Sequence, residues 1–112
     1  MDLRKDVSFH EATVVEFCQN DGVVKLELDE VLVNGVNQKV VVVVSSTFGT
    51  LVDGAPSNSY SLMAYDDGEV LSLDVSKGIL VLLIEWNDFD KSFSVTKSYE
   101  ISGKNICISV VG

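Results

Sequence analysis

The chain has very little of the chemistry that enzymes use. His10 is its only histidine, and no cysteine stands at ligand spacing from it. The nucleotide-binding motifs GxGxxG and GxxxxGK(S/T), the zinc-protease motif HExxH and the GxSxG nucleophile turn are all missing. The aspartates are not spaced as in an EF-hand loop. We therefore expect no enzymatic activity, no catalytic residue, no cofactor and no metal site, and His10 is expected to be a partly exposed strand residue.

Long apolar segments are also missing. The first residues, Met1 to Asp6, contain no apolar stretch of the kind found in signal peptides. The longest uninterrupted apolar run is six residues, whereas a membrane-spanning helix needs about 20. We expect a cytoplasmic protein that does not associate with membranes.

The chain has only two cysteines, Cys18 and Cys107, and both fall in segments expected to be strands. Neither belongs to a CxxC pair or neighbours a histidine, so neither has the setting of an activated thiol. In a reducing compartment the two are expected to be buried thiols that pack as small hydrophobic groups. A disulfide linking the first and last strands would require export.

Basic residues are scarce relative to acidic ones. There are 17 acidic and 8 basic side chains, which gives a net charge of −9. This charge repels phosphate backbones and so excludes generic nucleic-acid binding. It would steer a basic partner or a cation, and it also keeps a strongly apolar protein in solution. The apolar content of 46% is ordinary for a folded protein, and the length predicts one domain, residues 1–112.

Turn signals separate extended segments throughout the chain, and no useful window has the helical spacing of apolar residues. The expected turns are at 20–22, 34–35, 66–68 and 102–105, with Asn34-Gly35 the strongest hairpin signal and Asp66-Asp67-Gly68 the next. The sequence predicts an all-β fold: an antiparallel meander of about eight strands that closes as a sandwich or rolled barrel, without a substantial helix. The predicted strands are Ser8–Cys18, Val23–Val33, Gln38–Ser46, Ser59–Tyr65, Glu69–Val75, Ile79–Trp86, Ser94–Ile101 and Asn105–Val111. The segment from Gly49 to Asn58, with the lone proline Pro56, is expected to be irregular and to cross between sheets.

Two of these strands are apolar on both faces. Side chains alternate along a strand, so the five valines from Val40 to Val44 fill both sides, as do the residues from Ile79 to Ile84. Either a loop such as Gly49–Asn58 covers the outer face, or a second copy of the chain does. We favour a second copy, which predicts a homo-oligomer, with a dimer as the first guess. The residues expected to mediate self-association are Val40, Val41, Val42, Val43, Val44, Leu80, Leu82 and Ile84.

Acidic and aromatic residues gather at two predicted turns. Tyr65, Asp66, Asp67 and Glu69 lie at the first, and Glu85, Trp86, Asp88, Phe89 and Asp90 lie at the second. If the adjoining strands pair antiparallel, we expect the two turns at or near opposite ends of the shared ladder. In different sheets they could meet. Together they predict a patch for a basic partner protein, with Trp86 and Phe89 as anchors. Alternatively, Asp66 and Asp67 or Asp88 and Asp90 bind a divalent cation weakly, or the aspartates only cap turns while Trp86 lies in the core.

Three functions follow, in this order. The first is a non-enzymatic assembly protein that self-associates. The second is an inhibitor of a basic protein. In its small size, acidity and expected β-structure, the chain resembles the intracellular inhibitors of bacteria such as the immunity proteins of toxin systems, and the resemblance implies no particular site. The third is an enzyme or small-ligand binder in the mouth of a rolled sheet, which requires side chains that converge there from among His10, Tyr60, Tyr65, Trp86 and Tyr99.

Overall fold

The computed structural model describes residues 7–57 and 60–111 and contains eight strands and no helix. The strands are β1 (Val7–Ser8), β2 (Thr13–Asn20), β3 (Val23–Val33), β4 (Val36–Val52), β5 (Ala55–Pro56), β6 (Asp67–Ser76), β7 (Ile79–Asp88) and β8 (Phe93–Val111). All pairings are antiparallel. The all-β prediction is confirmed. In the described part of the chain no helix is long and apolar enough to cross a membrane.

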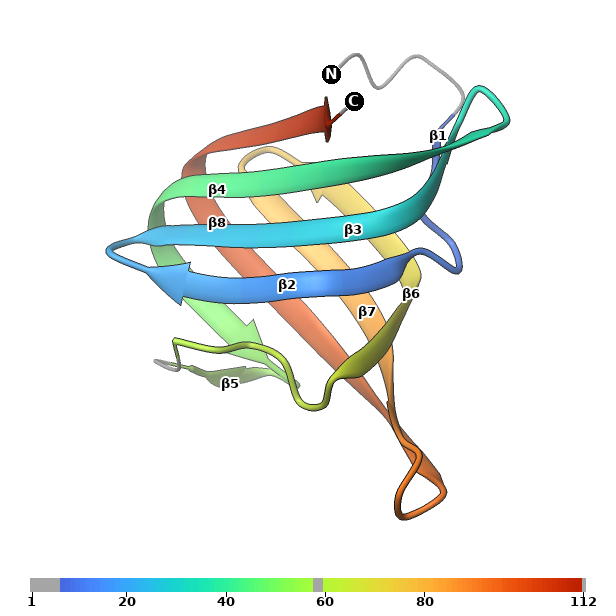
Figure 1. Cartoon of the computed structure of the whole chain (residues 1–112). Helices are drawn as coiled ribbons and strands as arrows, with labels where there is room; N and C mark the ends of the chain where they lie inside the picture. The colour runs from blue at the N-terminus through green and yellow to red at the C-terminus, as the bar shows by residue number, and fades with distance from the viewer. Residues whose placement is uncertain (1–6, 58–59, 112) are drawn as a thin grey trace.

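The sheet closes into a barrel. Strands β2, β3, β4, β8, β7 and β6 follow one another around the ring, with β1 added beside β3 and β5 beside β4 (Figure 1). The closing seam between β2 and β6 is short: one cross-strand pair, Thr13 with Glu69, and hydrogen bonds that Val70 makes with Glu11 and Ala12 at 2.8 Å. The rolled barrel is therefore the observed form of the predicted closure.

Two long strands make this closure possible. β4 has 17 residues and β8 has 19, and they pair from Lys39–Val111 to Val52–Tyr99 with a bulge at Thr47/Gly49. The turn predicted at 102–105 does not exist, because β8 continues through it. Gly103 packs there against Val44, and a Cβ at this position would lie 2.8 Å from the Ser45 carbonyl oxygen. The missing side chain lets β8 bend closely across β4.

The tight hairpins follow the turn chemistry. Asp21-Gly22, Asn34-Gly35, Asp53-Gly54 and Lys77-Gly78 each join paired strands, and all eight residues have positive φ. This is the conformation of a two-residue type I′ turn. The segment predicted as irregular, Gly49–Asn58, instead contains the end of β4, the Asp53-Gly54 turn and β5. It does not cross between sheets, because there is one sheet. Asn58 lies outside the described residues.

One predicted strand is wrong. Within Ser59–Tyr65, Ser59 lies outside the described residues, and residues 60–65 form only a single bridge, between Cys18 and Ser61. This segment runs along the edge of β2, where Gln19 N–H donates to the Tyr60 carbonyl at 2.7 Å and Leu62 N–H donates to the Phe17 carbonyl at 3.0 Å. The second predicted hairpin, at Asp66-Asp67-Gly68, is therefore absent, and Asp67 begins β6 instead.

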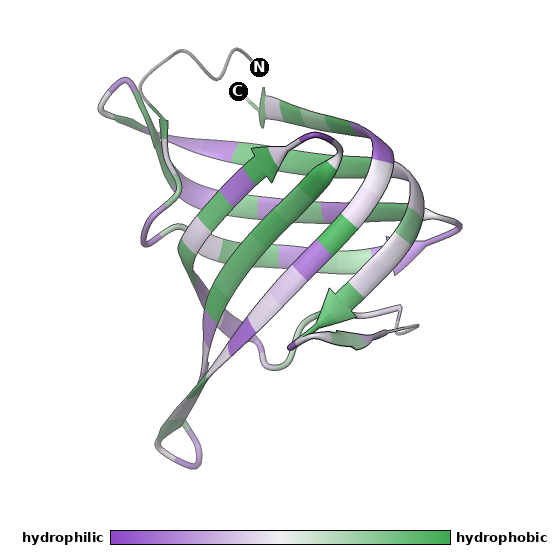
Figure 2. Cartoon of the chain, turned by 180° about the vertical axis from the view of Figure 1, so that it is seen from behind, coloured by the Kyte–Doolittle hydropathy of each residue, from purple (hydrophilic) through white to green (hydrophobic). Residues whose placement is uncertain are grey.

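The barrel interior takes up most of the apolar side chains. Figure 2 shows β7 as green over most of its length, because it is apolar on both faces. Six of the eight residues predicted for self-association point inward and are fully buried within this one chain: Val40, Val42, Val44, Leu80, Leu82 and Ile84. They need no second copy to cover them. Val41 and Val43 are half-buried on the outer surface.

The cysteines correct a further expectation. Cys18 is half-buried and Cys107 is exposed, so they are not a pair of core thiols. Both lie in one cross-strand row, Cys18–Lys25–Val43–Cys107, across β2, β3, β4 and β8. Three interstrand spacings separate them, roughly 14 Å, which is too far for a disulfide. Burial and the adjacent Glu16 carboxylate raise the pKa of the Cys18 thiol, so it is not an activated nucleophile.

Candidate functional site: an acidic cleft beside the β7–β8 ribbon

The residues of the two predicted acidic turns meet in the structure, although only the second segment forms a turn. β6 and β7 pair antiparallel from Asp67–Asn87 to Ser76–Ile79. The expectation that such pairing puts the turns at opposite ends is wrong. One turn precedes the first residue of β6 and the other follows the last residues of β7, and in an antiparallel pair these two ends adjoin.

A cleft opens where this ladder stops. Its volume is about 470 Å³, and its lining residues are Ala64, Tyr65, Asp66, Asp67, Asn87, Asp88, Phe89 and Asp90. Continuing the register by one residue would place Asp66 directly opposite Asp88. Like charges in such a pair are destabilising. The two segments diverge at this point, and the space between them carries four carboxylates and no basic side chain.

One wall of the cleft is a two-stranded ribbon. The β7–β8 ladder continues to Asp88–Phe93, whereas β4 stops pairing with β8 at Val52–Tyr99. The end of the β7–β8 hairpin therefore projects from the barrel (Figure 1). Phe89 at its tip is 75% exposed. A large aromatic side chain left in water at the end of a projecting hairpin is available to a partner.

Polar contacts hold this ribbon at its base. The Asn87 amide donates to the Asp67 carboxylate at 2.7 Å, and its carbonyl accepts from the Ser94 hydroxyl at 2.6 Å. The Lys91 N–H donates to Asp88 at 3.2 Å and shapes the turn. The cleft wall is therefore fixed by hydrogen bonds rather than by apolar packing alone.

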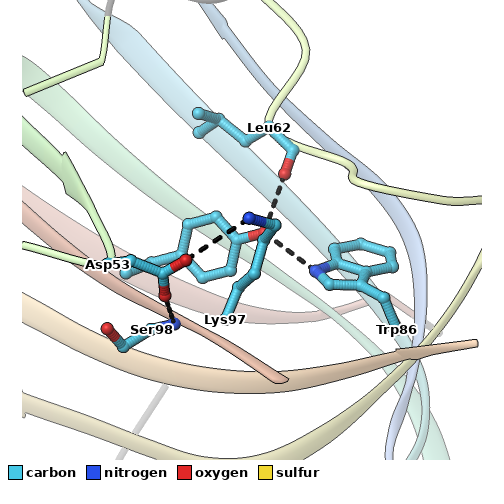
Figure 3. Close-up of polar contacts among 6 residues, drawn as sticks. Asp53, Leu62, Trp86, Lys97 and Ser98 are labelled. Atoms are coloured by element: carbon cyan, nitrogen blue, oxygen red, sulfur yellow. Dashed lines mark hydrogen bonds and ion pairs between the residues drawn. The ribbon is translucent and has the colours of Figure 1, made fainter. Parts of the chain in front are cut away.

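The opposite wall is held from inside the barrel. Trp86 Nε1 donates to the Tyr99 hydroxyl at 2.8 Å, and that hydroxyl donates to the Leu62 carbonyl at 3.0 Å (Trp86 and Leu62 are labelled in Figure 3). Together with the backbone bonds to β2 at Tyr60 and Leu62, this contact holds the segment against the barrel. Tyr65 then packs edge-on against Phe93 of the ribbon, with ring centroids 5.7 Å apart.

Asp53, also drawn in Figure 3, contacts the β8 edge of the ribbon. Its carboxylate accepts from the Ser98 N–H at 2.8 Å and pairs with Lys97 at 3.3 Å. The Ser98 hydrogen bond, with Lys97 beside it, lowers the pKa of Asp53. Lys97 is therefore already paired and does not neutralise the cleft.

Six of the nine acidic and aromatic residues at the two predicted turns line the cleft: Tyr65, Asp66, Asp67, Asp88, Phe89 and Asp90. Three do not. Trp86 is fully buried in the core, so it is not an anchor. Glu69 and Glu85 pair with each other across β6 and β7, and both lie outside the cleft lining. Asn87 and Phe93 were missed, and an amide beside an acidic turn was the only available signal for Asn87.

One alternative drawn from the sequence is observed in part: Trp86 lies in the core, and Asp88 accepts a backbone N–H within its turn. The others gain no support. Among the described residues, no group of three or more histidine, cysteine or acidic side chains could hold a metal ion. The side chains required for a pocket in the barrel mouth do not converge. Trp86 and Tyr99 are buried, whereas Tyr60 is 77% exposed. His10 is an exposed turn residue, not a strand residue, and its Nδ1 lies 3.1 Å from the Leu71 carbonyl.

No protein-family model matches the chain, and no curated protein or solved structure matches it significantly.

Proposed function

We propose that this protein is a non-enzymatic binding module that captures a basic partner protein in the acidic cleft. The observation that carries the proposal is the lining itself: four carboxylates, no basic side chain, and the exposed ring of Phe89 beside them. This is the inhibitor-like function among the three, and the geometry favours it over an assembly protein because most of the residues expected to mediate assembly are interior.

The two kinds of residue have different roles. The carboxylates raise the rate at which a cationic surface arrives, because complementary charge steers diffusional encounter. Phe89 supplies apolar contact that slows dissociation once the partner is bound, as aromatic anchors do at other interfaces. The net charge of −9 extends the attraction beyond the cleft.

A peptide titration tests the proposal. The probe is a short arginine-rich peptide with one tryptophan, and its counterpart has glutamine at every basic position. We expect the basic peptide to shift the backbone amide resonances of residues 64–67 and 87–90 in NMR spectra, and the neutral peptide to leave them unchanged.

Two variants of equal charge separate the cleft from the general field of the protein. One carries Asp66→Asn, Asp67→Asn, Asp88→Asn and Asp90→Asn. Asparagine retains an oxygen acceptor for the hydrogen bonds at Asp67 and Asp88. The control carries Asp21→Asn, Glu27→Gln, Asp74→Asn and Glu100→Gln on other surfaces. The proposal requires weaker binding in the first variant than in the control. Equal binding in the two variants would refute it.

A further inference from the structure

A second cavity lies near the C-terminal end of β4, and its chemistry differs from that of the cleft. Its volume is about 300 Å³, at the lower end of the range of small-molecule sites. The lining residues are Gln19, Thr47, Phe48, Gly49, Thr50, Pro56 and Ser57. None carries a charge, although 22% of the chain is charged. The lining combines one amide, three hydroxyls, an aromatic ring and a proline.

Phe48 is held out of the core by the backbone. It lies at the bulge between Thr47 and Gly49, where the β4–β8 register shifts. Bulges redirect side chains, and they are common beside functional sites. The ring is 73% exposed, so it contributes little to folding where it stands.

A hydrogen bond from Thr50 orients the side-chain amide of Gln19. The hydroxyl of Thr50, which is only 6% exposed, donates to the Gln19 side-chain oxygen at 2.9 Å. This contact uses one lone pair of the amide oxygen and orients the amide plane. Within residues 7–57 and 60–111 no group accepts from the two N–H donors of the side chain, so they are available to a ligand oxygen. Tyr60, another exposed ring, lies directly across from Gln19 on the β2 edge, since the Gln19 N–H donates to the Tyr60 carbonyl.

We propose that this cavity binds a neutral saccharide. A sugar ring presents C–H groups on one face, which the negative face of an aromatic ring attracts. Its hydroxyls both donate and accept, so they suit the amide donors of Gln19 and the hydroxyl oxygen of Thr47, whose own hydrogen is donated to the Val44 carbonyl at 3.1 Å. A charged ligand would find no counter-charge in the lining and would lose hydration without compensation. The proposal is independent of the acidic cleft.

The test begins with an array of neutral and acidic glycans, followed by NMR titration of the neutral glycans that bind. We expect the amide resonances of Gly49 and Thr50 to shift. Phe48→Ala is expected to weaken binding about tenfold, the effect of losing one contact worth about 1.4 kcal/mol. Gln19→Glu is expected to weaken it too, because glutamate still accepts from Thr50 but has no N–H donors.

The matched control is Phe89→Ala, which removes a ring of nearly equal exposure from the acidic cleft and should leave glycan binding unchanged. Loss of binding in the two cavity variants but not in the control supports the proposal. It is overturned if no neutral glycan binds, if only acidic glycans bind, or if Phe48→Ala binds as well as wild type. Binding of a proline-rich peptide in this cavity, with no glycan binding, would also overturn it.

Discussion

Asn87 donates its amide N–H to the carboxylate of Asp67 across the last pair of the β6–β7 ladder, at 2.7 Å. One residue further, the same register would bring Asp66 against Asp88, and the strands part instead. A single amide therefore marks the boundary between a paired sheet and an acidic cleft. The repulsion that ends the ladder is also the source of the negative field that we propose attracts a partner.

Removing that contact should lower stability. Asp67→Ala leaves the partly buried Asn87 amide without its acceptor, and we expect the free energy of unfolding to fall by about 1 kcal/mol. Urea denaturation followed by tryptophan fluorescence measures this. Asp66→Ala is the control, because Asp66 is exposed and its loss relieves repulsion. Equal destabilisation by both substitutions would contradict the role given to the Asp67–Asn87 bond.

Removing the Tyr99 hydroxyl should lower stability more than removing the Asp67 carboxylate. In Tyr99→Phe the buried Trp86 N–H loses its acceptor and the Leu62 carbonyl loses its donor, and we expect a loss of about 1–3 kcal/mol. Hydrogen exchange should also show faster opening of residues 60–66, which this hydroxyl holds. Tyr60→Phe changes an exposed hydroxyl and should alter the unfolding free energy by less than about 0.5 kcal/mol. Unchanged stability and exchange in Tyr99→Phe would show that the bond does not hold this segment.

The same tyrosine makes stability depend on alkaline pH. Burial raises the pKa of Tyr99 from 10.0 to about 12. Between these values the unfolded chain releases the phenolic proton while the folded chain keeps it, so rising pH favours unfolding. The contribution of the protonated Tyr99 side chain to the free energy of unfolding is complete below pH 10 and is lost as pH rises towards 12. The stability difference between wild type and Tyr99→Phe should therefore narrow over this range, and a constant difference would contradict the assignment.

Self-association stays a separate prediction. On the outer face of β4, Val41 and Val43 are the only members of the predicted assembly set that reach the surface. Light scattering should give a mass above the monomer's 12.2 kDa, and Val41→Thr with Val43→Thr should lower it. Val81→Thr is the control, because Val81 is an outward residue of β7 between Asp74 and Glu100. A wild-type mass of 12.2 kDa at every concentration would rule out a dimer.

Much of the fold could be predicted from local sequence patterns. Turn residues with positive φ marked the hairpin at Asn34-Gly35, and period-two apolar spacing located β3 to the residue. The inner and outer residues of β4 and β7 also follow from alternation. Periodicity shows which residues share a face of a strand, but it does not show whether the sheet closes and buries one of its faces. The need for a second copy was inferred from apolar content, whereas a barrel buries the inner half of those side chains within one chain.

The two wrongly predicted turns have a common physical cause: residues typical of turns also serve close packing. Gly68 lies against the Trp86 indole, where a Cβ would overlap the ring, and Gly103 lets β8 bend across β4. Both glycines were interpreted as turn residues. Alternation along β7 places Trp86 on the inward face with Leu80, Leu82 and Ile84, although it was predicted as an anchor. No local pattern contains the partner of its N–H, the Tyr99 hydroxyl 13 residues away. The sequence identified most of the residues that line the cleft, but it placed the two segments at or near opposite ends of the ladder.

The most direct test of the central claim is the salt dependence of association. Stopped-flow fluorescence of the arginine-rich peptide gives the association rate constant for wild type and for the two charge-matched quadruple variants. Screening weakens steering as ionic strength rises. We predict that the wild-type and control rates fall roughly tenfold or more between low and high salt, and that the cleft variant is slow throughout. Equal salt dependence in the cleft variant and the control would show that the cleft does not guide the partner.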